Sequence, residues 1–416
     1  MSNNKHIAVV GGGAAGLMAA GTARRAGCAV TLFEHNKKVG RKLLITGKGR
    51  CNLTNHCTPQ DFLGSVTVNP HFLYSALHRL SPADTMALFE SLGLPLKTER
   101  GQRVFPASDT SSDVLAALLR YAAGTTFVHA HVSRLQVTEG RVAGLVADGK
   151  ACAFDAVILA TGGMSYPLTG SDGSGYALAE ELGHTLMPRA PSLVPINSDC
   201  PDCLRMQGLS LKNVALRIKD QQGNILYRDF GEMLFTHFGL SGPMVLSATA
   251  HLHRQDIASL TAEIDLKPAL DDKTLDRRLL SDLAGHTNKD FANILGGLVP
   301  LKMIGVILDR TGIDPHTKCH SVTREQRERL LRSLKSFEVP LASLRPIEEA
   351  IVTRGGVSVK EIHPSTMMSK LVEGLCFAGE MIDVDAYTGG FNLQIAFSTG
   401  YTAGNGAAEY VNESGI

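Results

Sequence analysis

"HIAVVGGGAAG", residues 6–16, decides the fold, because it joins an apolar, β-branched run to a glycine-rich turn. Residues 6–10 have the short, continuous hydrophobic pattern of a buried parallel strand. Residues 14–27 follow with helical spacing, and "CAVTLFE", residues 28–34, predicts a second strand. Together these segments predict a strand–helix–strand unit, from which parallel sheets are built.

The glycines of this turn, Gly11, Gly13 and Gly16, follow the pattern G-x-G-x-x-G. The first permits the tight turn, the second lets a pyrophosphate approach the backbone, and the third lets the helix pack on the strand. The helix N-terminus then attracts phosphate charge. Glu34 ends the second strand, where a carboxylate accepts hydrogen bonds from a ribose diol. The combination predicts dinucleotide binding, and a plain strand–turn–helix connection is the alternative.

The composition of the chain limits its class and its partners. Its 416 residues, 44% hydrophobic, predict two or three packed units. The 41 basic and 40 acidic residues nearly cancel, so we expect neither nucleic acid nor an anionic membrane as a partner. The start "MSNNKHIAVVGGG" has no separate apolar region of a signal peptide, and no window reaches eighteen uninterrupted apolar residues. We therefore expect a cytoplasmic protein.

The eight cysteines are scattered, which predicts reduced thiols rather than a disulfide framework. Cys200 and Cys203 form a C-x-x-C pair, with Cys319 and His320 as the only further candidate ligands. A zinc site would need two ligands at a typical spacing, and a thioredoxin-like role would need a strand–helix–strand setting. The sequence therefore predicts no metal site.

Three further stretches distinguish FAD from NAD as the dinucleotide. They are "GRKLLITGKGRCNLTN" (40–55), "AVILATGGMSYPLTGSDGSG" (156–175) and "GLCFAGEMIDVDAYTGGFNLQIAFSTGYTAG" (374–404). A chain that returns to the nucleotide from its C-terminal end suits the extended FAD. Glu380 would bond the ribityl or pyrophosphate region, and a helix starting near Asn392 would direct its positive end at the flavin N1 and C2 carbonyl. The alternative for the last stretch is a core strand followed by a close-packed helix.

The chain resembles a known family through five long motifs. They are "GGGAAG", "GRKLLITGKGRCNLTN", "ATGGMSYPLTGSDGSGY", "LFTHFGLSGP" and "GGVSVKEIHPSTMMSKLVEGLCFAGEMIDVDAYTGGFNLQIAFSTG". The resemblance is to the bacterial aminoacetone-oxidase-like FAD-binding flavoproteins, which include a bile-acid 4-reductase-like branch. It runs from the first predicted strand to the last predicted helix.

This resemblance implies an α/β fold: a Rossmann-like FAD-binding domain of the two-dinucleotide-binding type, with an inserted β-barrel and helical subdomain. We expect the FAD-binding domain over 1–192 and 346–416, the barrel over 193–267, the helical part over 268–335 and a return to the barrel over 336–345. Runs such as "VALRIKD" and "NILYRDF" are typical of strands, while "KTLDRRLLSDLAGH" and "TREQRERLLRSLKSF" have helical spacing.

The resemblance also implies the cofactor contacts. The first turn would bind the pyrophosphate, Glu34 the adenosine ribose, and the backbone of Val132 the adenine. The cationic segment 40–55 would run along the pyrophosphate toward the flavin, although a solvated basic loop is the alternative. The implied set is Gly11, Gly13, Ala14, Ala15, Gly16, Glu34, Lys42, Thr46, Gly47, Gly49, Arg50, Cys51, Asn52, Val132, Thr161, Gly162, Gly163, Gly379, Glu380, Gly390, Phe391, Asn392 and Leu393.

Candidates for the substrate side are fewer. Tyr166 could position a carbonyl, His237, near Ser241, could move a proton near neutral pH, and Arg103 could pair with a carboxylate. Packing roles for the first two and an exposed position for the arginine are the alternatives. Met368 stands where the family pattern has an acid, which leaves the role of that acid open in this chain.

The expected chemistry is hydride transfer by bound FAD on a small or steroid-like substrate. No second G-x-G-x-x-G with a downstream acid occurs, so NAD(P)H would dock transiently as the electron donor. An FAD-dependent amine oxidase that uses O2, and a low-turnover flavin-binding sensor that recognises a partner, are the alternatives. The sequence leaves the oligomeric state open.

Overall fold

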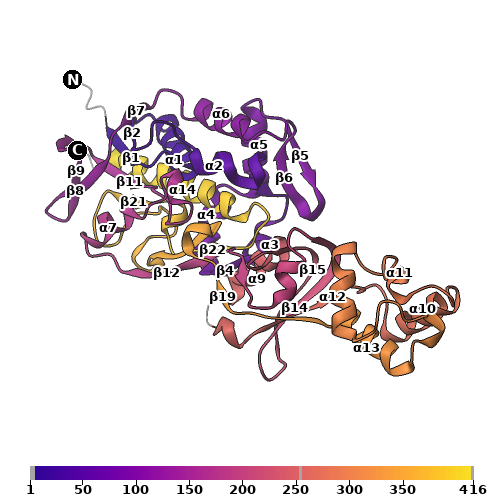
Figure 1. Ribbon diagram of the computed structural model, residues 1–416. Coiled ribbons are helices and arrows are strands. Elements are labelled where there is room, and N and C mark those ends of the chain that lie inside the picture. The colour runs from indigo at the N-terminus through magenta and orange to yellow at the C-terminus, as the bar shows by residue number, and fades with distance from the viewer. Residues whose placement is uncertain (1–4, 253–254, 414–416) are drawn as a thin grey trace. The chain divides into compact units, whose positions relative to one another are not determined.

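The computed structural model describes residues 5–252 and 255–413. The chain forms two compact units, Met1–Ser192 with Ile347–Ile416, and Leu193–Pro346 (Figure 1). The first unit is therefore built from both ends of the chain, and the second is an insertion between them.

A parallel five-stranded sheet lies at the centre of the first unit. Its order is β21-β11-β1-β2-β7, and every neighbouring pair is parallel. Helices connect β1 to β2 and β2 to β7, as in doubly wound folds, whereas an antiparallel sheet connects β7 to β11. Their bounds are β1 His6–Val10, β2 Ala29–Glu34, β7 Thr126–His129, β11 Ala156–Leu159 and β21 Leu375–Phe377.

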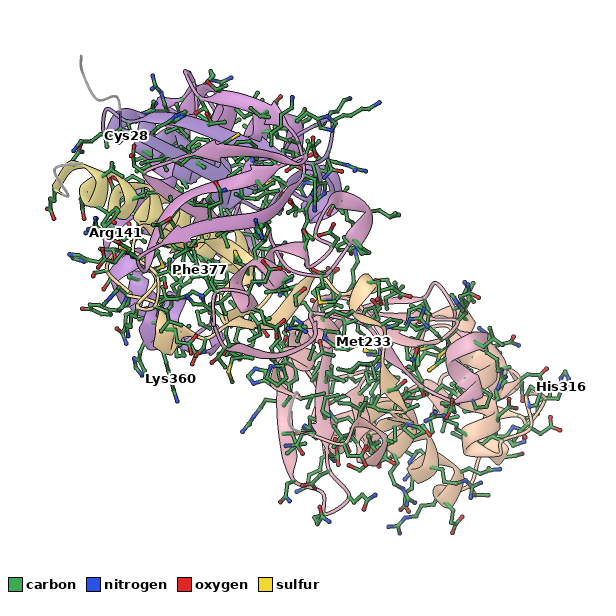
Figure 2. The ribbon with its side chains drawn as sticks, turned by 90° about the vertical axis from the view of Figure 1, so that its left-hand side faces the viewer. Cys28, Arg141, Met233, His316, Lys360 and Phe377 are labelled. Atoms are coloured by element: carbon green, nitrogen blue, oxygen red, sulfur yellow. The ribbon has the colours of Figure 1, made fainter. Side chains whose placement is uncertain are left out.

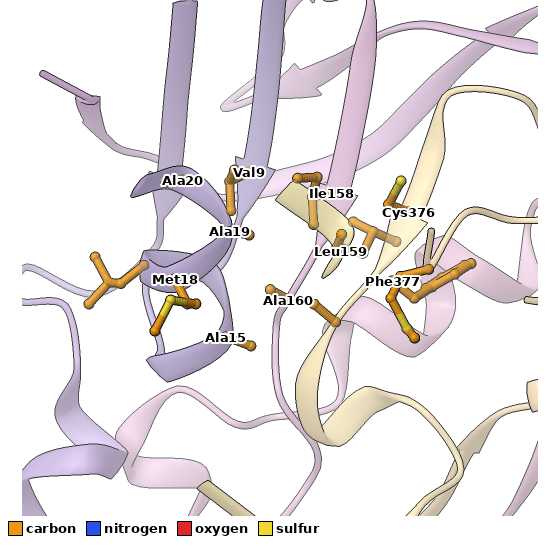
Figure 3. Packing of buried hydrophobic residues seen from close by; sticks show 14 of the residues in the cluster. Val9, Ala15, Met18, Ala19, Ala20, Ile158, Leu159, Ala160, Cys376 and Phe377 are labelled. Atoms are coloured by element: carbon orange, nitrogen blue, oxygen red, sulfur yellow. The ribbon is translucent and has the colours of Figure 1, made fainter. Parts of the chain in front are cut away.

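Two helices from opposite ends of the chain pack together beside this sheet. They are α1 (Ala14–Arg25) and α14 (Phe391–Glu413). A Cβ on Gly400 would lie 2.4 Å from the Ala15 carbonyl oxygen. A Cβ on Gly404 would lie 2.6 Å from the Ala19 carbonyl oxygen. The small residues of α14 therefore permit close helix contact, and the apolar core continues into β11 and β21 (Figure 3).

Smaller elements complete the first unit. An antiparallel sheet in the order β10-β9-β8, the pairs β12–β20 and β22–β4, and the sheet β3-β6-β5 surround the parallel sheet. The strands are β3 Thr54–Asn55, β4 Val66–Val68, β5 Leu96–Glu99, β6 Arg103–Pro106, β8 Val132–Thr138, β9 Arg141–Ala147, β10 Lys150–Ala153, β12 Leu186–Ser192, β20 Val352–Val357 and β22 Asp385–Ala386. The helices are α2 Arg41–Ile45, α3 Pro59–Leu63, α4 Tyr74–Arg79, α5 Pro82–Ser91, α6 Ser111–Tyr121 and α7 Ser174–Glu180.

The second unit combines a seven-stranded antiparallel sheet with a helical segment. The sheet order is β18-β17-β14-β15-β16-β13-β19, and Met233, on β15, is buried (Figure 2). Its strands are β13 Ile196–Asn197, β14 Ser210–Lys219, β15 Ile225–Thr236, β16 Gly239–Ser241, β17 Thr261–Asp265, β18 Phe337–Pro340 and β19 Ser343–Leu344. The helices are α8 Pro201–Arg205, α9 Pro243–His251, α10 Asp272–Ala284, α11 Phe291–Leu295, α12 Leu301–Thr311 and α13 Arg324–Lys335.

None of the helices within residues 5–252 and 255–413 combines the length and the hydrophobicity that a membrane crossing requires.

Candidate functional site

The glycine-rich turn between β1 and α1 has three glycines with different steric demands. Gly11 has a φ of +105°, and a Cβ there would lie 2.5 Å from the Ala160 carbonyl oxygen. A Cβ on Gly16 would lie 1.9 Å from the Gly11 carbonyl oxygen, so this position allows only glycine. A Cβ on Gly13 would meet no described atom within 4 Å. The backbone at Gly13 is therefore open to a ligand, while Gly11 and Gly16 hold the turn in place.

Glu34 stands at the end of β2 and faces the same turn. Its Oε2 accepts a hydrogen bond from the Gly12 amide at 2.8 Å, and its Oε1 accepts from the Asn36 amide and side chain, each at 2.8 Å. A carboxylate has about four acceptor positions, so one on Oε2 can still take a ribose hydroxyl. The side chain is thus fixed beside the turn, and its contact with the adenosine ribose stays a prediction.

The residues around the turn fit an FAD. Gly13 caps α1 without a side chain, and no acid lies in the first turn of this helix, so its amide groups present positive potential to an anion. On the cofactor path expected from the sequence, Asn52 Oδ1 is buried without a hydrogen-bond partner among the described residues. A buried acceptor of this kind calls for a donor from a ligand or water.

The cations of segment 40–55 contact carboxylates of this chain. Lys42, on α2, donates to Glu380 Oε2 at 2.6 Å and to Ser165 Oγ at 2.7 Å. Arg50 pairs with Glu99 and, at 2.7 Å, with Asp109. Their charges are therefore largely compensated inside the protein, and their contact with the pyrophosphate stays a prediction.

The turn that follows α2 is unusual in its backbone. Gly47, Lys48, Gly49 and Cys51 all have φ values between +57° and +84°. The Cys51 thiol is fully buried, and burial raises its pKa to about 12, so it stays protonated at neutral pH. Thr46 Oγ1 donates to the Leu43 carbonyl oxygen at 2.7 Å and closes α2. The Thr46 side chain is therefore held in position by a hydrogen bond within this turn.

The second expected stretch is anchored on Glu380 through β20. Thr353 Oγ1 accepts from the amides of Met164 and Ser165, at 2.7 and 3.0 Å, and the Thr353 amide donates to Glu380 Oε1 at 2.8 Å. A Cβ on Gly163 would lie 2.5 Å from Thr353 Oγ1. Gly162 has a φ of +80°, and Thr161 precedes it at the end of β11. Lys42, Ser165, Thr353 and Glu380 thus form one polar network beside the Gly162–Gly163 turn.

The third expected stretch brings the start of α14 to segment 40–55. A Cβ on Gly390 would lie 2.3 Å from the Thr54 carbonyl oxygen, and Asn55 Nδ2 donates to the Gly389 carbonyl oxygen at 3.1 Å. Asn392 Nδ2 donates to the Ala386 carbonyl oxygen at 2.8 Å. Phe391 and Leu393 flank this residue in the first turn of α14, and Gly379, with a φ of +77°, opens the turn before Glu380.

The remaining candidates of the first unit are not members of this network, although Tyr166 directly follows Ser165. Val132 begins β8, and the nearby Ala130 amide donates to the Glu34 carbonyl oxygen at 3.2 Å. Tyr166 has a φ of +53°, and burial with nearby Glu349 raises the pKa of its phenol. Arg103 is exposed and donates to the Arg100 carbonyl oxygen at 3.0 Å.

Met368 is a partly buried residue packed against the core, where its carbonyl oxygen accepts from the His363 amide at 2.8 Å. An apolar side chain suits this packing position. No interaction of the described residues gives it a part in the network around Glu380.

The candidates of the second unit surround the β15–β16 turn. His237 is exposed and its ring contacts the edge of Phe238, with centroids 5.0 Å apart, while Ser241 ends β16. Cys200 and Cys203 are free thiols, and Arg310 donates to Cys200 Sγ at 3.7 Å. Within the described residues, no three side chains of the metal-ligating types come together. The roles of Tyr166 and His237 stay predictions.

Three residues of this region were missed in the sequence. They are Ser165 and Thr353, which complete the network of Glu380, and Arg354, which pairs with buried Asp385. Isolated hydroxyls give no sequence signal. The two acids of "DVD", residues 383–385, do stand out in an apolar stretch, and this pattern could have been noticed.

The comparison with known families decides the relationship. The family model described as "HI0933-like protein Rossmann domain" matches residues 5–406. The chain belongs to the HI0933-like Rossmann-domain family. Its fold is accordingly the Rossmann-type FAD-binding fold expected from the sequence, and the expectation of FAD as the cofactor is confirmed.

Curated relatives of this HI0933-like protein match along almost the entire chain. The 3-dehydro-bile acid delta(4,6)-reductase of Clostridium scindens is 32% identical, covering 97% of this chain and 99% of the relative. The ribosomal RNA dihydrouridine synthase of Escherichia coli is 30% identical, covering 94% and 95%. The protein of the same name from Haemophilus influenzae is also 30% identical, covering 96% and 98%.

Solved structures agree with the fold. The 3-ketosteroid-delta4-(5alpha)-dehydrogenase of Rhodococcus jostii superimposes with a TM-score of 0.51 at 16% identity, covering 97% of both chains. The quinol fumarate reductase FrdA subunit of Escherichia coli gives a TM-score of 0.53 at 17% identity, covering 99% of this chain and 71% of that one. These similarities concern the fold alone.

The HI0933-like protein is therefore an FAD-dependent oxidoreductase, as the sequence predicts. One expectation about its partners loses its support. The near-neutral composition was read as excluding nucleic acid, yet two relatives are named ribosomal RNA dihydrouridine synthase. Net charge reports on the whole surface, whereas a local patch or a small contact can bind RNA without changing the total.

Proposed function

We propose that this flavoprotein reduces a ring carbon–carbon double bond conjugated with a carbonyl group, with NADH or NADPH as the electron donor. The supporting observation is that relatives with two different names match the chain almost equally, at 32% and 30% identity. The names delta(4,6)-reductase and dihydrouridine synthase both indicate saturation of a ring double bond conjugated with a carbonyl. The reaction that both names share therefore indicates the function of this chain better than the substrate of either relative does.

The chain's own residues can serve this reaction in distinct ways. The Gly11–Gly16 turn and the start of α1 would hold the diphosphate, and Glu34 would orient the adenosine ribose. The network of Lys42 and Glu380 would fix the Gly162–Gly163 turn, and the start of α14 would present its amides to the flavin. Bound FAD supplies hydride transfer from donor to substrate. Tyr166 or His237 would position the substrate carbonyl or move a proton.

The substrate class that we favour is a small or steroid-like cyclic enone. The supporting relative is the 3-dehydro-bile acid delta(4,6)-reductase, which matches 97% of this chain at 32% identity. A uridine in ribosomal RNA remains the second substrate to test, because two relatives carry that activity in their names.

Stopped-flow spectroscopy without oxygen tests the proposal. The FAD-loaded protein is first mixed with NADH or NADPH, and then with 2-cyclohexenone, 4-androstene-3,17-dione or a uridine-containing RNA. We expect one nucleotide to bleach the flavin absorbance and an enone to restore it. Reduction by aminoacetone and rapid recovery only with air would instead indicate the amine oxidase. A flavin that neither nucleotide nor amine reduces would indicate the low-turnover sensor.

A further inference from the structure

Saturation of a conjugated double bond consumes a proton as well as a hydride, and the inference that follows rests on the proposed function. The hydride ends on one carbon of the double bond, and the other carbon takes a proton. A shielded active site needs a group that holds this proton between turnovers. The first unit contains two buried carboxyl groups that the expected cofactor contacts do not use, those of Asp383 and Asp385.

One such cluster surrounds Asp385 on β22. Asp385 is 0% exposed, and its Oδ2 accepts from Ser192 Oγ at 2.6 Å and from the Arg354 guanidinium at 2.8 Å. Its Oδ1 is buried and has no hydrogen-bond partner among the described residues. Asp383, two residues earlier and 7% exposed, accepts from Asn69 Nδ2 at 3.0 Å. Two buried carboxyl groups thus lie close to one guanidinium.

The cluster adjoins the candidate cofactor site on both sides. Thr353, next to Arg354 on β20, belongs to the network of Glu380. At the other end, the carbonyl oxygen of Ala386, next to Asp385, accepts from Asn392 in the first turn of α14. Arg354 and Asp385 are therefore each one residue away from a contact that shapes one of the two turns expected at the flavin.

The charge balance favours one bound proton. With both carboxyl groups ionised, the two acids and Arg354 carry a net negative charge inside the protein, which burial makes costly. Burial raises the pKa of Asp385 and of Asp383, and the guanidinium opposes the shift in each. Because Oδ2 of Asp385 already accepts two hydrogen bonds, its free Oδ1 is the natural position for a proton. A proton on Oδ1 would have no hydrogen-bond acceptor among the described residues. Internal water would therefore accept it.

We propose that Asp385, with Asp383 and Arg354, forms a buried proton store that supplies the proton used in double-bond saturation. The O–H bond at Oδ1 breaks, its electron pair stays on the carboxylate, and the proton passes through internal water to the substrate carbon. A proton from solvent then returns to Oδ1 through the same internal water, while Ser192 and Arg354 keep their hydrogen bonds to Oδ2. The reduced nicotinamide is oxidised, the enone is reduced, and one solvent proton is consumed. Asp385 is a positioning residue, because it acts through other groups.

Asp385→Asn tests the store, with Asp265→Asn as the matched control. Asp265 is also buried, 6% exposed, and pairs with a cation, Lys335, at 2.6 Å, but belongs to the second unit. In Asp385→Asn we expect flavin reduction by the nucleotide within about 2-fold of wild type and reoxidation by 2-cyclohexenone at least about 10-fold slower. The pH dependence of that reoxidation should flatten. Asp265→Asn should retain the wild-type pH profile.

A second readout needs no activity. The folded state holds the Asp385 proton more tightly than the unfolded state, so wild-type stability falls as pH rises above the ordinary Asp range through the raised pKa. Thermal unfolding of the cofactor-free protein should lose this slope in Asp385→Asn. Should that variant not fold, Ser192→Ala keeps the carboxyl group, removes one donor to its ionised form and should move the reoxidation profile to higher pH.

The outcomes separate this inference from the proposed function. An enone that reoxidises wild type and Asp385→Asn at the same rate, with the same pH profile, would overturn the proton store alone. An unchanged pH slope of unfolding in Asp385→Asn would also overturn it. A wild-type flavin that no enone reoxidises would contradict the proposed function instead.

Discussion

Lys42 Nζ lies 2.6 Å from Glu380 Oε2, which joins α2 near the start of the chain to a residue 338 positions later. Ser165 Oγ and the Thr353 amide donate to the other oxygen of the same carboxylate, at 2.9 and 2.8 Å. Four separate segments thus meet at one side chain. This contact joins the two parts of the first unit, which an insertion of more than a hundred residues separates in the sequence.

Lys42→Met should destabilise the first unit by about 1–3 kcal/mol, because Glu380 loses its charged donor in a partly buried setting. A double-mutant cycle with Glu380→Gln, followed by urea unfolding, should give a coupling energy of about 1 kcal/mol or more. The exposed pair Arg324–Glu328 is the control, with an expected coupling of about 0.3–0.5 kcal/mol. Equal coupling in both pairs would contradict a structural role for the Lys42 contact.

Gly13→Ala and Gly16→Ala should separate cofactor binding from folding. Gly13 has φ −83° and ψ −169°, so alanine is tolerated, and its methyl group would occupy the open face. We expect unfolding free energy within about 1 kcal/mol of wild type and weaker FAD affinity. Gly16→Ala should destabilise the apoprotein by at least about 3 kcal/mol, because its Cβ meets the Gly11 carbonyl oxygen. Fluorescence titration measures the FAD affinity, and calorimetry measures the stability of the apoprotein. Unchanged FAD affinity in Gly13→Ala would contradict the assignment of Gly13 to the cofactor site.

Glu34→Ala should weaken FAD binding by about 5- to 150-fold, which corresponds to about 1–3 kcal/mol for ribose hydroxyls left without an acceptor. Release of FAD on dilution, followed by flavin fluorescence, measures the change. Glu181→Ala, a change of an exposed acid, should bind FAD like wild type. Equal retention of FAD in the two variants would remove Glu34 from the site.

His184 should make the protein less stable in mild acid. Its ring is buried, bonds Ser369 Oγ at 2.8 Å, and burial lowers its pKa below 6.5. The unfolded state therefore binds the proton first, and stability present above pH 6.5 is lost as pH falls, at up to about 1.4 kcal/mol per pH unit. Chemical unfolding between pH 7.5 and 5 should show that the free energy of unfolding depends less on pH in His184→Gln than in the wild type. His56→Gln, a change of an exposed histidine, is the control variant.

His237→Asn should lower turnover while FAD stays bound, if the exposed imidazole moves a proton during the reaction. We expect a fall of about 100-fold in kcat, measured with NAD(P)H and an enone, at unchanged FAD content. Wild-type kinetics in this variant would leave Tyr166 as the remaining sequence candidate, and Tyr166→Phe would then be measured in the same way.

The sequence predicts the locally encoded parts of this fold well. The strand, glycine turn and helix around Gly11, and the acid at Glu34, follow from patterns within about thirty residues. The helix over 324–335 likewise follows from the spacing of its apolar residues. A capping box between Thr323 and Gln326 stabilises its N-terminus. In each case, neighbours along the chain determine the structure.

The sequence could not show which charged groups meet across the fold. Lys42 and Arg50 read as cations for a phosphate, but the fold places acids from other segments against both. The partners of Asp385 come from β12 and β20, so only the tertiary structure reveals that cluster. Long-range ion pairs depend on sheet order and on the inserted unit, and no local pattern encodes them.

We propose that the flavin of this protein delivers a hydride to a conjugated double bond. Mass spectrometry after a single anaerobic turnover measures the product of this transfer, with enzyme-bound flavin prereduced by NAD(P)H and equimolar 4-androstene-3,17-dione or 2-cyclohexenone. We predict a saturated ketone with two additional hydrogens, formed in proportion to the flavin that is reoxidised. Unchanged enone beside a flavin that stays reduced until air is admitted would contradict the account.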